Sequence, residues 1–154
     1  MIANVLKRSW IALLPLFCSS LFIFMSQSSA AQSSKTGKLT IEIAGIRNTE
    51  GNIRVALRTD ETTYIASKVV AINPTTLTAE AVFEELPEGN YSVVVIHDEN
   101  KNEKLDFNDT GVPIEGYGHS NNPAKRPGPP DFSETKFAFS APGSTMEIKL
   151  VYWL

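Results

Sequence analysis

Cysteine and histidine are scarce in this chain, and their scarcity excludes several kinds of site. The one cysteine among 154 residues, Cys18, lies in an apolar N-terminal stretch. The rest of the chain can therefore form no disulfide, thiolate nucleophile or cysteine-ligated metal centre. The two histidines, His97 and His119, are too few for a histidine-rich site, so zinc is not expected.

Clusters of basic residues are also lacking. The chain has 17 acidic and 14 basic side chains, and no run of lysine or arginine occurs after the N-terminal region. Binding to nucleic acid needs neutralisation of phosphates, so a nucleic-acid partner is not expected. With 42% hydrophobic and 20% charged residues, the composition is typical of a single globular domain.

The N-terminus has the three parts of a signal peptide. Lys7 and Arg8 precede an apolar stretch, which ends before small residues that allow cleavage after Ala30 or Ala31. An uncleaved anchor helix is disfavoured because the apolar stretch is short and interrupted by Pro15. We predict a signal peptide over residues 1–31, a polar leader over 32–37 and a domain over 38–154. The mature protein would be exported, periplasmic or extracellular, monomeric and without a membrane span.

Short segments of alternating polarity follow, separated by turn residues. Seven of them are typical of β-strands: residues 39–43, 53–58, 69–72, 78–83, 91–97, 136–140 and 145–152. The one stretch long enough for a short helix, residues 60–68, is rich in residues that disfavour helices. We therefore predict an all-β, antiparallel two-sheet sandwich of about seven strands, prealbumin-like or immunoglobulin-like.

Residues 98–134 interrupt this pattern with 37 residues that contain no convincing strand. This segment holds five of the nine prolines and four of the nine glycines, together with apolar residues that favour burial. Long structureless loops in compact domains are usually functional or disordered, and the apolar content favours an ordered loop. We therefore look for the functional site in this segment.

The first part of the long loop has the oxygen spacing of a twelve-residue calcium loop. Counted from Asp98, oxygen-bearing side chains occupy positions 1, 3, 5, 9 and 12, and a backbone carbonyl at position 7 completes the set. Two features depart from the pattern: Glu103 occupies the usual glycine position, and position 12 is an aspartate instead of the longer glutamate. The alternative is an Asx-rich turn whose side chains bind their own backbone. The predicted ligands of one Ca²⁺ are Asp98, Asn100, Asn102, Lys104, Asp106 and Asp109.

Two further blocks follow the acidic stretch: Gly111-x-Pro113-x-Glu115-Gly116-Tyr117-Gly118, continuing to Ser120-Asn121-Asn122, and then Gly128-Pro129-Pro130-x-Phe132. Together with His97-Asp98 and the calcium-type spacing, they resemble a family of exported bacterial proteins catalogued as domain of unknown function 2141. Glu103 and His119 depart from that family's pattern, in which a glycine and an aromatic residue stand at these positions. The resemblance implies a small exported β-sandwich and no established activity.

The second half of the long loop offers aromatic faces and amide donors beside glycines, as in sites for sugars or peptides. A non-enzymatic binding or accessory module is the favoured function, with a small-molecule, glycan or protein ligand. A loop packed by its own side chains explains the same residues.

A metal-dependent, hydrolase-like enzyme using His97, Glu115 and His119 is a second function, although His97 continues the alternation of its strand and a structural role is commoner. An envelope assembly or surface module is a third. The candidate ligand-binding residues are His97, Glu115, Tyr117, His119, Asn121 and Asn122.

Overall fold

The computed structural model describes residues 35–153 and confirms an all-β fold of two packed sheets. The predicted signal peptide and the first three residues of the predicted leader lie outside the described residues. The rest of that leader is not a separate segment, because the first strand already begins at Thr36.

A three-stranded sheet forms one layer, in the order β4-β1-β8. Its members are β1 (Thr36–Ala44), β4 (Ala79–Pro87) and β8 (Gly143–Lys149). β1 pairs antiparallel with β4 but parallel with β8, so the expectation of an entirely antiparallel sandwich is wrong for this pair. A parallel pair needs a long connection, and nearly the whole domain lies between β1 and β8.

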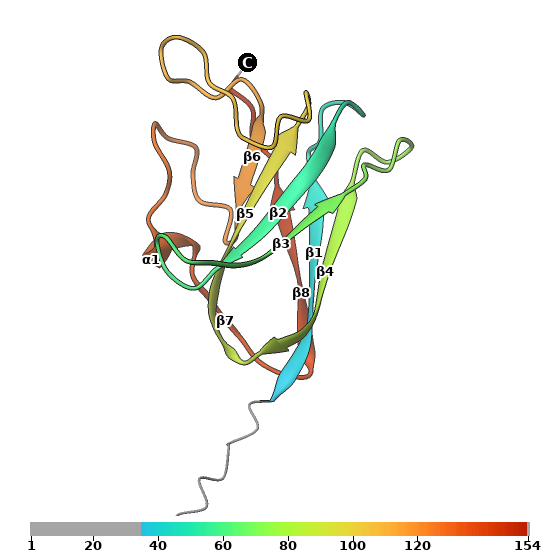
Figure 1. Ribbon diagram of the computed structural model, residues 1–154, viewed down its shortest axis with the longest axis vertical. Helices are drawn as coiled ribbons and strands as arrows, with labels where there is room; N and C mark the ends of the chain where they lie inside the picture. The colour runs from blue at the N-terminus through green and yellow to red at the C-terminus, as the bar shows by residue number, and fades with distance from the viewer. Residues whose placement is uncertain (1–34, 154) are drawn as a thin grey trace, which may run out of the picture. The chain divides into compact units, whose positions relative to one another are not determined.

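The second layer is a five-stranded sheet in the order β3-β2-β5-β6, with β7 paired to the start of β5. In Figure 1, β2, β5 and β6 lie side by side, and the short helix α1 is at the left of the view, away from β1 and β4. The elements of this layer and the helix are β2 (Asn52–Arg58), β3 (Tyr64–Val70), β5 (Gly89–Asp98), β6 (Gly116–His119), α1 (Phe132–Thr135) and β7 (Phe137–Phe139).

The core lies between the layers and follows the period of two that the sequence predicts. Leu39, Ile41 and Ile43 of β1 are fully buried or nearly so, and Val93 and Val95 of β5 face them from the other sheet. Alternate side chains of a strand point to opposite faces, so one face of each sheet supplies this core. Val94 and Ile96 consequently point to the outer face of the five-stranded sheet.

Two segments differ from the predicted secondary structure. β3 covers Tyr64–Val70, so the predicted strand at 69–72 begins too late and the stretch 60–68 is largely strand. The segment 98–134 contains β6 and most of α1, and it is therefore not a continuous loop.

β6 has only four residues, two of them glycine, which is why its sequence does not look like a strand. The glycines are needed because neighbouring side chains approach the backbone closely. A Cβ atom on Gly118 would lie 2.7 Å from Cγ2 of Ile148, and one on Gly116 would overlap the ring of Tyr152. Absence of a side chain at these positions allows β6 to pack against β8 and the C-terminal segment.

Candidate functional site

His97 is fully buried near the end of β5 and has a partner on each ring nitrogen. Nε2 lies 2.8 Å from the carbonyl oxygen of Glu50, and Nδ1 lies 2.8 Å from the hydroxyl of Tyr152. A carbonyl can only accept, so Nε2 carries the proton and Nδ1 accepts from the tyrosine. Burial raises the pKa of Tyr152, which keeps that donor protonated. His97 therefore holds together the C-terminal segment and the connection between β1 and β2, which belong to different sheets.

Glu115 is also buried, and it fastens the acidic segment to the start of β6. Oε1 accepts a hydrogen bond of 2.9 Å from the backbone amide of Glu99, and Oε2 accepts one of 3.1 Å from the amide of Asp106. Both carboxylate oxygens are thus used by backbone donors on either side of the loop. This arrangement stabilises the loop and leaves the carboxylate a poor general base.

The acidic segment is organised by side chains that bind its own backbone. The fully buried Asp98 accepts hydrogen bonds from the amides of Asn102 and Glu103, at 3.0 and 2.9 Å. Asn100 accepts from the amide of Asn102, and Asn102 accepts from the amide of Lys104, which gives two successive Asx turns. Glu103 has a φ of +71°, so the backbone at the usual glycine position adopts the left-handed conformation despite the side chain.

Four of the predicted calcium ligands are drawn together by this folding. Asn100 and Asn102 each donate from Nδ2 to Oδ2 of Asp106, at 2.5 and 2.7 Å, and Asp98 holds the loop that carries them. These bonds keep the pKa of Asp106 below its usual range. Asp109, in contrast, lies on an exposed turn that Asn108 closes, and no contact joins it to the other four among the described residues. No group of three or more acidic, histidine or cysteine side chains suited to a metal occurs in residues 35–153.

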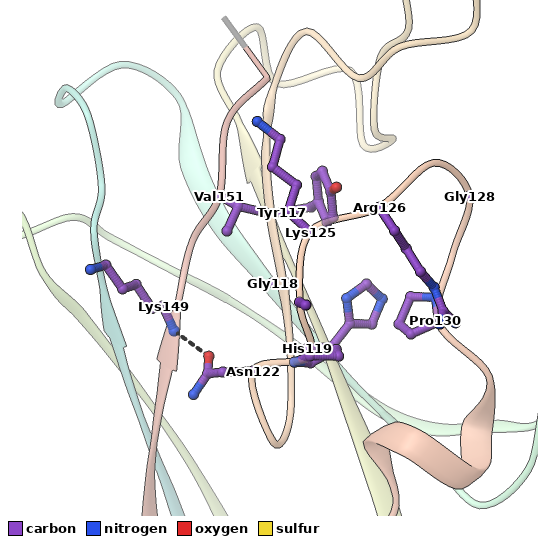
Figure 2. Close-up of a pocket in the computed structure, with 12 residues that line it drawn as sticks. Tyr117, Gly118, His119, Asn122, Lys125, Arg126, Gly128, Pro130, Lys149 and Val151 are labelled. Atoms are coloured by element: carbon purple, nitrogen blue, oxygen red, sulfur yellow. Dashed lines mark hydrogen bonds between the residues drawn. The ribbon is translucent and has the colours of Figure 1, made fainter.

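Asn121 and Asn122 tie segments of the domain together. Both residues have positive φ angles. Their side-chain amides form hydrogen bonds with backbone groups of neighbouring segments. Nδ2 of Asn121 donates to the carbonyls of Glu134 and Lys136, each at 3.0 Å. The Asn122 amide bonds the backbone of β8 at Glu147 and Lys149, and Figure 2 shows it pointing toward Lys149. Their amide groups therefore have structural partners, which favours the alternative of a loop packed by its own side chains at these two positions.

The outer face of the five-stranded sheet carries a cavity of about 400 Å³. Val94 and Ile96 of β5, with Tyr117 and His119 of β6, line it from the sheet. Two segments complete the walls: 105–113 from the acidic part of the loop, and 126–129 from its proline-rich part. Trp153 lines the same cavity and donates from Nε1 to the hydroxyl of Tyr117 at 2.8 Å. Tyr64 and Phe107, 59% and 55% exposed, are among its most exposed lining residues.

A smaller pocket of about 180 Å³ adjoins this cavity and shares Tyr117, His119 and Arg126 with it. Figure 2 shows the His119 ring pointing toward Arg126 and Pro130. Burial, assisted by the positive charge of Arg58, lowers the pKa of His119 to about 4. The histidine is therefore neutral at neutral pH and contributes a flat, polar ring to both pockets.

The three residues of the hydrolase-like hypothesis are not assembled into one constellation. In the β5–β6 register His97 pairs with Gly116 and Val94 pairs with His119, so the two histidines belong to opposite faces of the sheet. His97 faces the core, where Tyr152 and the backbone occupy its nitrogens, whereas His119 faces the outer cavity. The structure thus brings only Tyr117 and His119, of the six candidate ligand-binding residues, to the main cavity.

The sequence reasoning missed several residues of this site. Arg58, Phe107 and Trp153 line the cavity but carry no local motif. Leu105 lines it too, and the calcium-type spacing marks this residue only as an apolar anchor of the loop. The sequence Val93-Val94-Val95-Ile96 does indicate a site of this kind, because a strand with apolar side chains on both faces needs other segments packed against both. The position of Arg58 opposite Ser92 depends on the β2–β5 register, which becomes known only from the fold.

Among residues 35–153 there is no helix long and apolar enough to cross a membrane. No curated protein and no solved structure matches the chain. A family model described as "uncharacterized protein conserved in bacteria (DUF2141)" matches residues 41–147, which include most of both sheets, the acidic segment and every residue that lines the cavity except Trp153. The chain belongs to this bacterial family, as the motifs of the long loop predict.

Proposed function

We propose that this protein is an exported, monomeric and non-enzymatic binding module, located in the periplasm or outside the cell, with a sandwich of the prealbumin or immunoglobulin type. The observation that carries the proposal is the cavity on the outer face of the five-stranded sheet. Its volume of about 400 Å³ falls within the range of small-molecule sites, and its lining is largely apolar and aromatic. A small molecule with an apolar body is the ligand that such a lining favours.

The acidic segment has a supporting role in this proposal. It supplies one wall of the cavity through Leu105 and Phe107, and one Ca²⁺ bound by residues 98–109 would fix that wall. The left-handed backbone at Glu103 and the proximity of Asn100 and Asn102 to Asp106 support such a site. To bind the ion, the two amides would turn so that Oδ1 takes the place of the Nδ2 that donates to Asp106. Asp98 would supply a further oxygen, and Lys104 a backbone carbonyl.

Titration with the neutral dye N-phenyl-1-naphthylamine tests the binding function, because its fluorescence rises in apolar surroundings. We expect saturable binding with one site per chain. Val94→Phe, which fills the floor of the cavity, should weaken binding at least tenfold. Val82→Phe is the matched control, since Val82 is also half-buried but belongs to β4 in the other sheet, and it should leave binding unchanged. Absence of saturable binding, or equal binding by Val94→Phe, contradicts the proposal.

A further inference from the structure

Arg58 stands at the end of β2 with its side chain on the outer face of the sheet, opposite Ser92. Only 7% of it is exposed, although arginine is seldom buried without a charged partner. Its guanidinium donates to three neutral oxygens at rather long distances: 3.2 Å to Oγ of Ser92, 3.5 Å to Oγ1 of Thr135 and 3.4 Å to the carbonyl of Glu61. Its Nε is buried and has no hydrogen-bond partner.

No carboxylate compensates the charge of Arg58 within the described part of the chain. The ion pairs of basic side chains found there involve Arg47, Arg54, Lys104 and Arg126. A buried charge without a counter-ion is costly in a folded protein, and natural proteins usually pair it or bind an ion beside it. Within residues 35–153 the charge of Arg58 meets only neutral partners: the three oxygens and the ring of Phe132, whose centroid lies 6.0 Å from Cζ. Its position therefore has a cost for folding that no acidic group offsets.

Arg58 also lines the outer-face cavity, whose other walls are largely apolar and aromatic. Two arginines and no acidic residue line this cavity, although the chain as a whole has a net charge of −3. The second arginine, Arg126, already forms a two-pronged ion pair with Glu134. Arg58 is thus the cationic group of the cavity that has a free donor and no acidic partner among the described residues.

We propose that the cavity binds a small amphipathic anion, with an apolar or aromatic body and a single carboxylate or similar oxyanion that pairs with Arg58. This inference rests on the proposed binding function and adds the chemical class of the ligand. Val94, Ile96 and Phe107 contact the apolar body, and the buried Nε and Nη groups receive the anionic group. A guanidinium is suited to this task because its planar array of donors matches the two oxygens of a carboxylate.

Burial of Arg58 before the ligand arrives strengthens this recognition. Ion pairs formed on binding usually lose much of their energy to removal of water from both partners. Here the arginine is already removed from water, so only the ligand's anionic group loses hydration. A neutral isostere of the ligand would leave the charge of the buried guanidinium uncompensated. It should therefore bind more weakly than the anion.

Displacement of N-phenyl-1-naphthylamine by two nearly isosteric compounds tests the inference, with 1-naphthylacetate as the anion and 1-naphthylacetamide as its neutral counterpart. For the full mature protein at pH 7, we expect the carboxylate to bind at least tenfold more tightly than the amide. Arg58→Met should bind both compounds equally, with the affinity for the amide unchanged within about threefold. Arg58→Lys, which keeps the charge, should retain part of the preference. Lys38→Met is the control and should retain all of the preference, because Lys38 is exposed on β1 in the other sheet and does not line the cavity.

Each outcome is decisive, and the two proposals fail in different ways. If the dye does not bind, the cavity is not a binding site and both proposals are overturned. If the dye binds but the carboxylate competes no better than the amide, the binding function stands and the anion inference is overturned. A preference that survives in Arg58→Met also overturns it. Should Arg58→Met fail to fold, the comparison of the two compounds on the unaltered protein and on Arg58→Lys still decides.

Discussion

The phenol of Tyr152 donates a hydrogen bond to the buried Nδ1 of His97, and the two rings meet edge to face at 6.1 Å between centroids. The contact joins the C-terminal segment to the end of β5, where the acidic segment begins. It also makes the histidine a structural residue, since its other nitrogen is bonded to a backbone carbonyl.

Tyr152→Phe removes this donor and leaves a buried nitrogen without a partner. We expect the free energy of unfolding to fall by about 1–3 kcal/mol, the cost of an unsatisfied buried polar group. Denaturation in urea measures the change. Tyr64→Phe serves as the control, because Tyr64 is 59% exposed and should tolerate the loss of its hydroxyl. Equal stability of Tyr152→Phe and the unaltered protein would show that His97 finds its partner elsewhere.

Glu115→Gln tests whether this carboxylate holds the acidic segment in place. The amide replaces one acceptor by a donor that faces the backbone N–H of Glu99 or Asp106, so we expect a loss of about 1–3 kcal/mol. Hydrogen exchange at those two amides should accelerate more than elsewhere. Glu103→Gln is the matched control, because that side chain is 75% exposed and forms only a long contact with Arg54. Unchanged exchange in Glu115→Gln would contradict the role.

The sequence predicts those parts of the fold whose side chains alternate strictly. In β1, Leu39, Ile41 and Ile43 alternate with polar residues and are buried as expected. β3 is an edge strand with mostly exposed side chains, among them Tyr64, Ile65 and Val69, so its sequence shows no such alternation. The position and length of β3 are set by the pairing of its backbone with β2. The amino-acid sequence of the strand does not reveal that pairing.

For a related reason, the sequence points to only some of the residues that the fold brings to the candidate site. Glu115, His97 and the asparagines stand out by residue type and spacing, but the same features serve hydrogen bonds that hold the loop. Arg58 and Trp153 are far from the loop motifs in sequence and reach the cavity through the fold. A buried arginine with neutral partners cannot be recognised before its surroundings are known.

Three glutamates stand in a row across the outer face of the three-stranded sheet. Glu42 of β1 pairs with Glu80 of β4 on one side and with Glu147 of β8 on the other, and all three are exposed. Like charges directly opposite one another destabilise a sheet. Glu42→Thr should therefore raise the free energy of unfolding by about 0.5–1 kcal/mol in low salt, with a smaller gain in 1 M NaCl because salt screens the repulsion. Glu84→Thr, outside the row, should give no such salt-dependent gain; a gain of equal size there would refute the explanation.

The low pKa of His119 predicts a specific dependence of stability on pH. The folded protein holds this imidazole neutral down to a pKa of about 4, whereas the unfolded chain binds a proton near pH 6.5. The unfolded state therefore binds more protons between these values, and stability falls as pH falls through this window. Between pH 7 and pH 5 the loss due to His119 should be about 2 kcal/mol.

Urea denaturation at both pH values, in the unaltered protein and in His119→Phe, isolates this contribution. The phenylalanine keeps a ring beside Tyr117, with which His119 forms an edge-to-face contact, and it carries no titratable group. The variant should lose about 2 kcal/mol less than the unaltered protein over the same pH range, since the carboxylates titrate equally in both. If the two proteins lose the same free energy of unfolding between pH 7 and pH 5, His119 is not held neutral by burial and by the charge of Arg58.

Calcium binding to the acidic segment should appear as a rise in melting temperature between EDTA and millimolar Ca²⁺. Sites of this type in exported modules bind at about 10⁻⁴ to 10⁻³ M. At a tenfold excess over the dissociation constant the stabilisation is about 1.4 kcal/mol, or roughly 5 °C for a domain of this size. Asp106→Ala should abolish the rise, because Asn100 and Asn102 both converge on that carboxylate.

Two further variants make the calcium test specific. Asp109→Ala should retain the rise, because this residue lies on a separate turn that Asn108 closes. Loss of the rise in this variant would show that the twelve-residue spacing governs the site. Glu80→Gln removes a carboxylate from the other sheet and should not alter the response to Ca²⁺. If the unaltered protein melts at the same temperature in EDTA and in Ca²⁺, the Asx turns alone order the segment. The wall of the cavity would then be held by Asp98 and Glu115 without a metal.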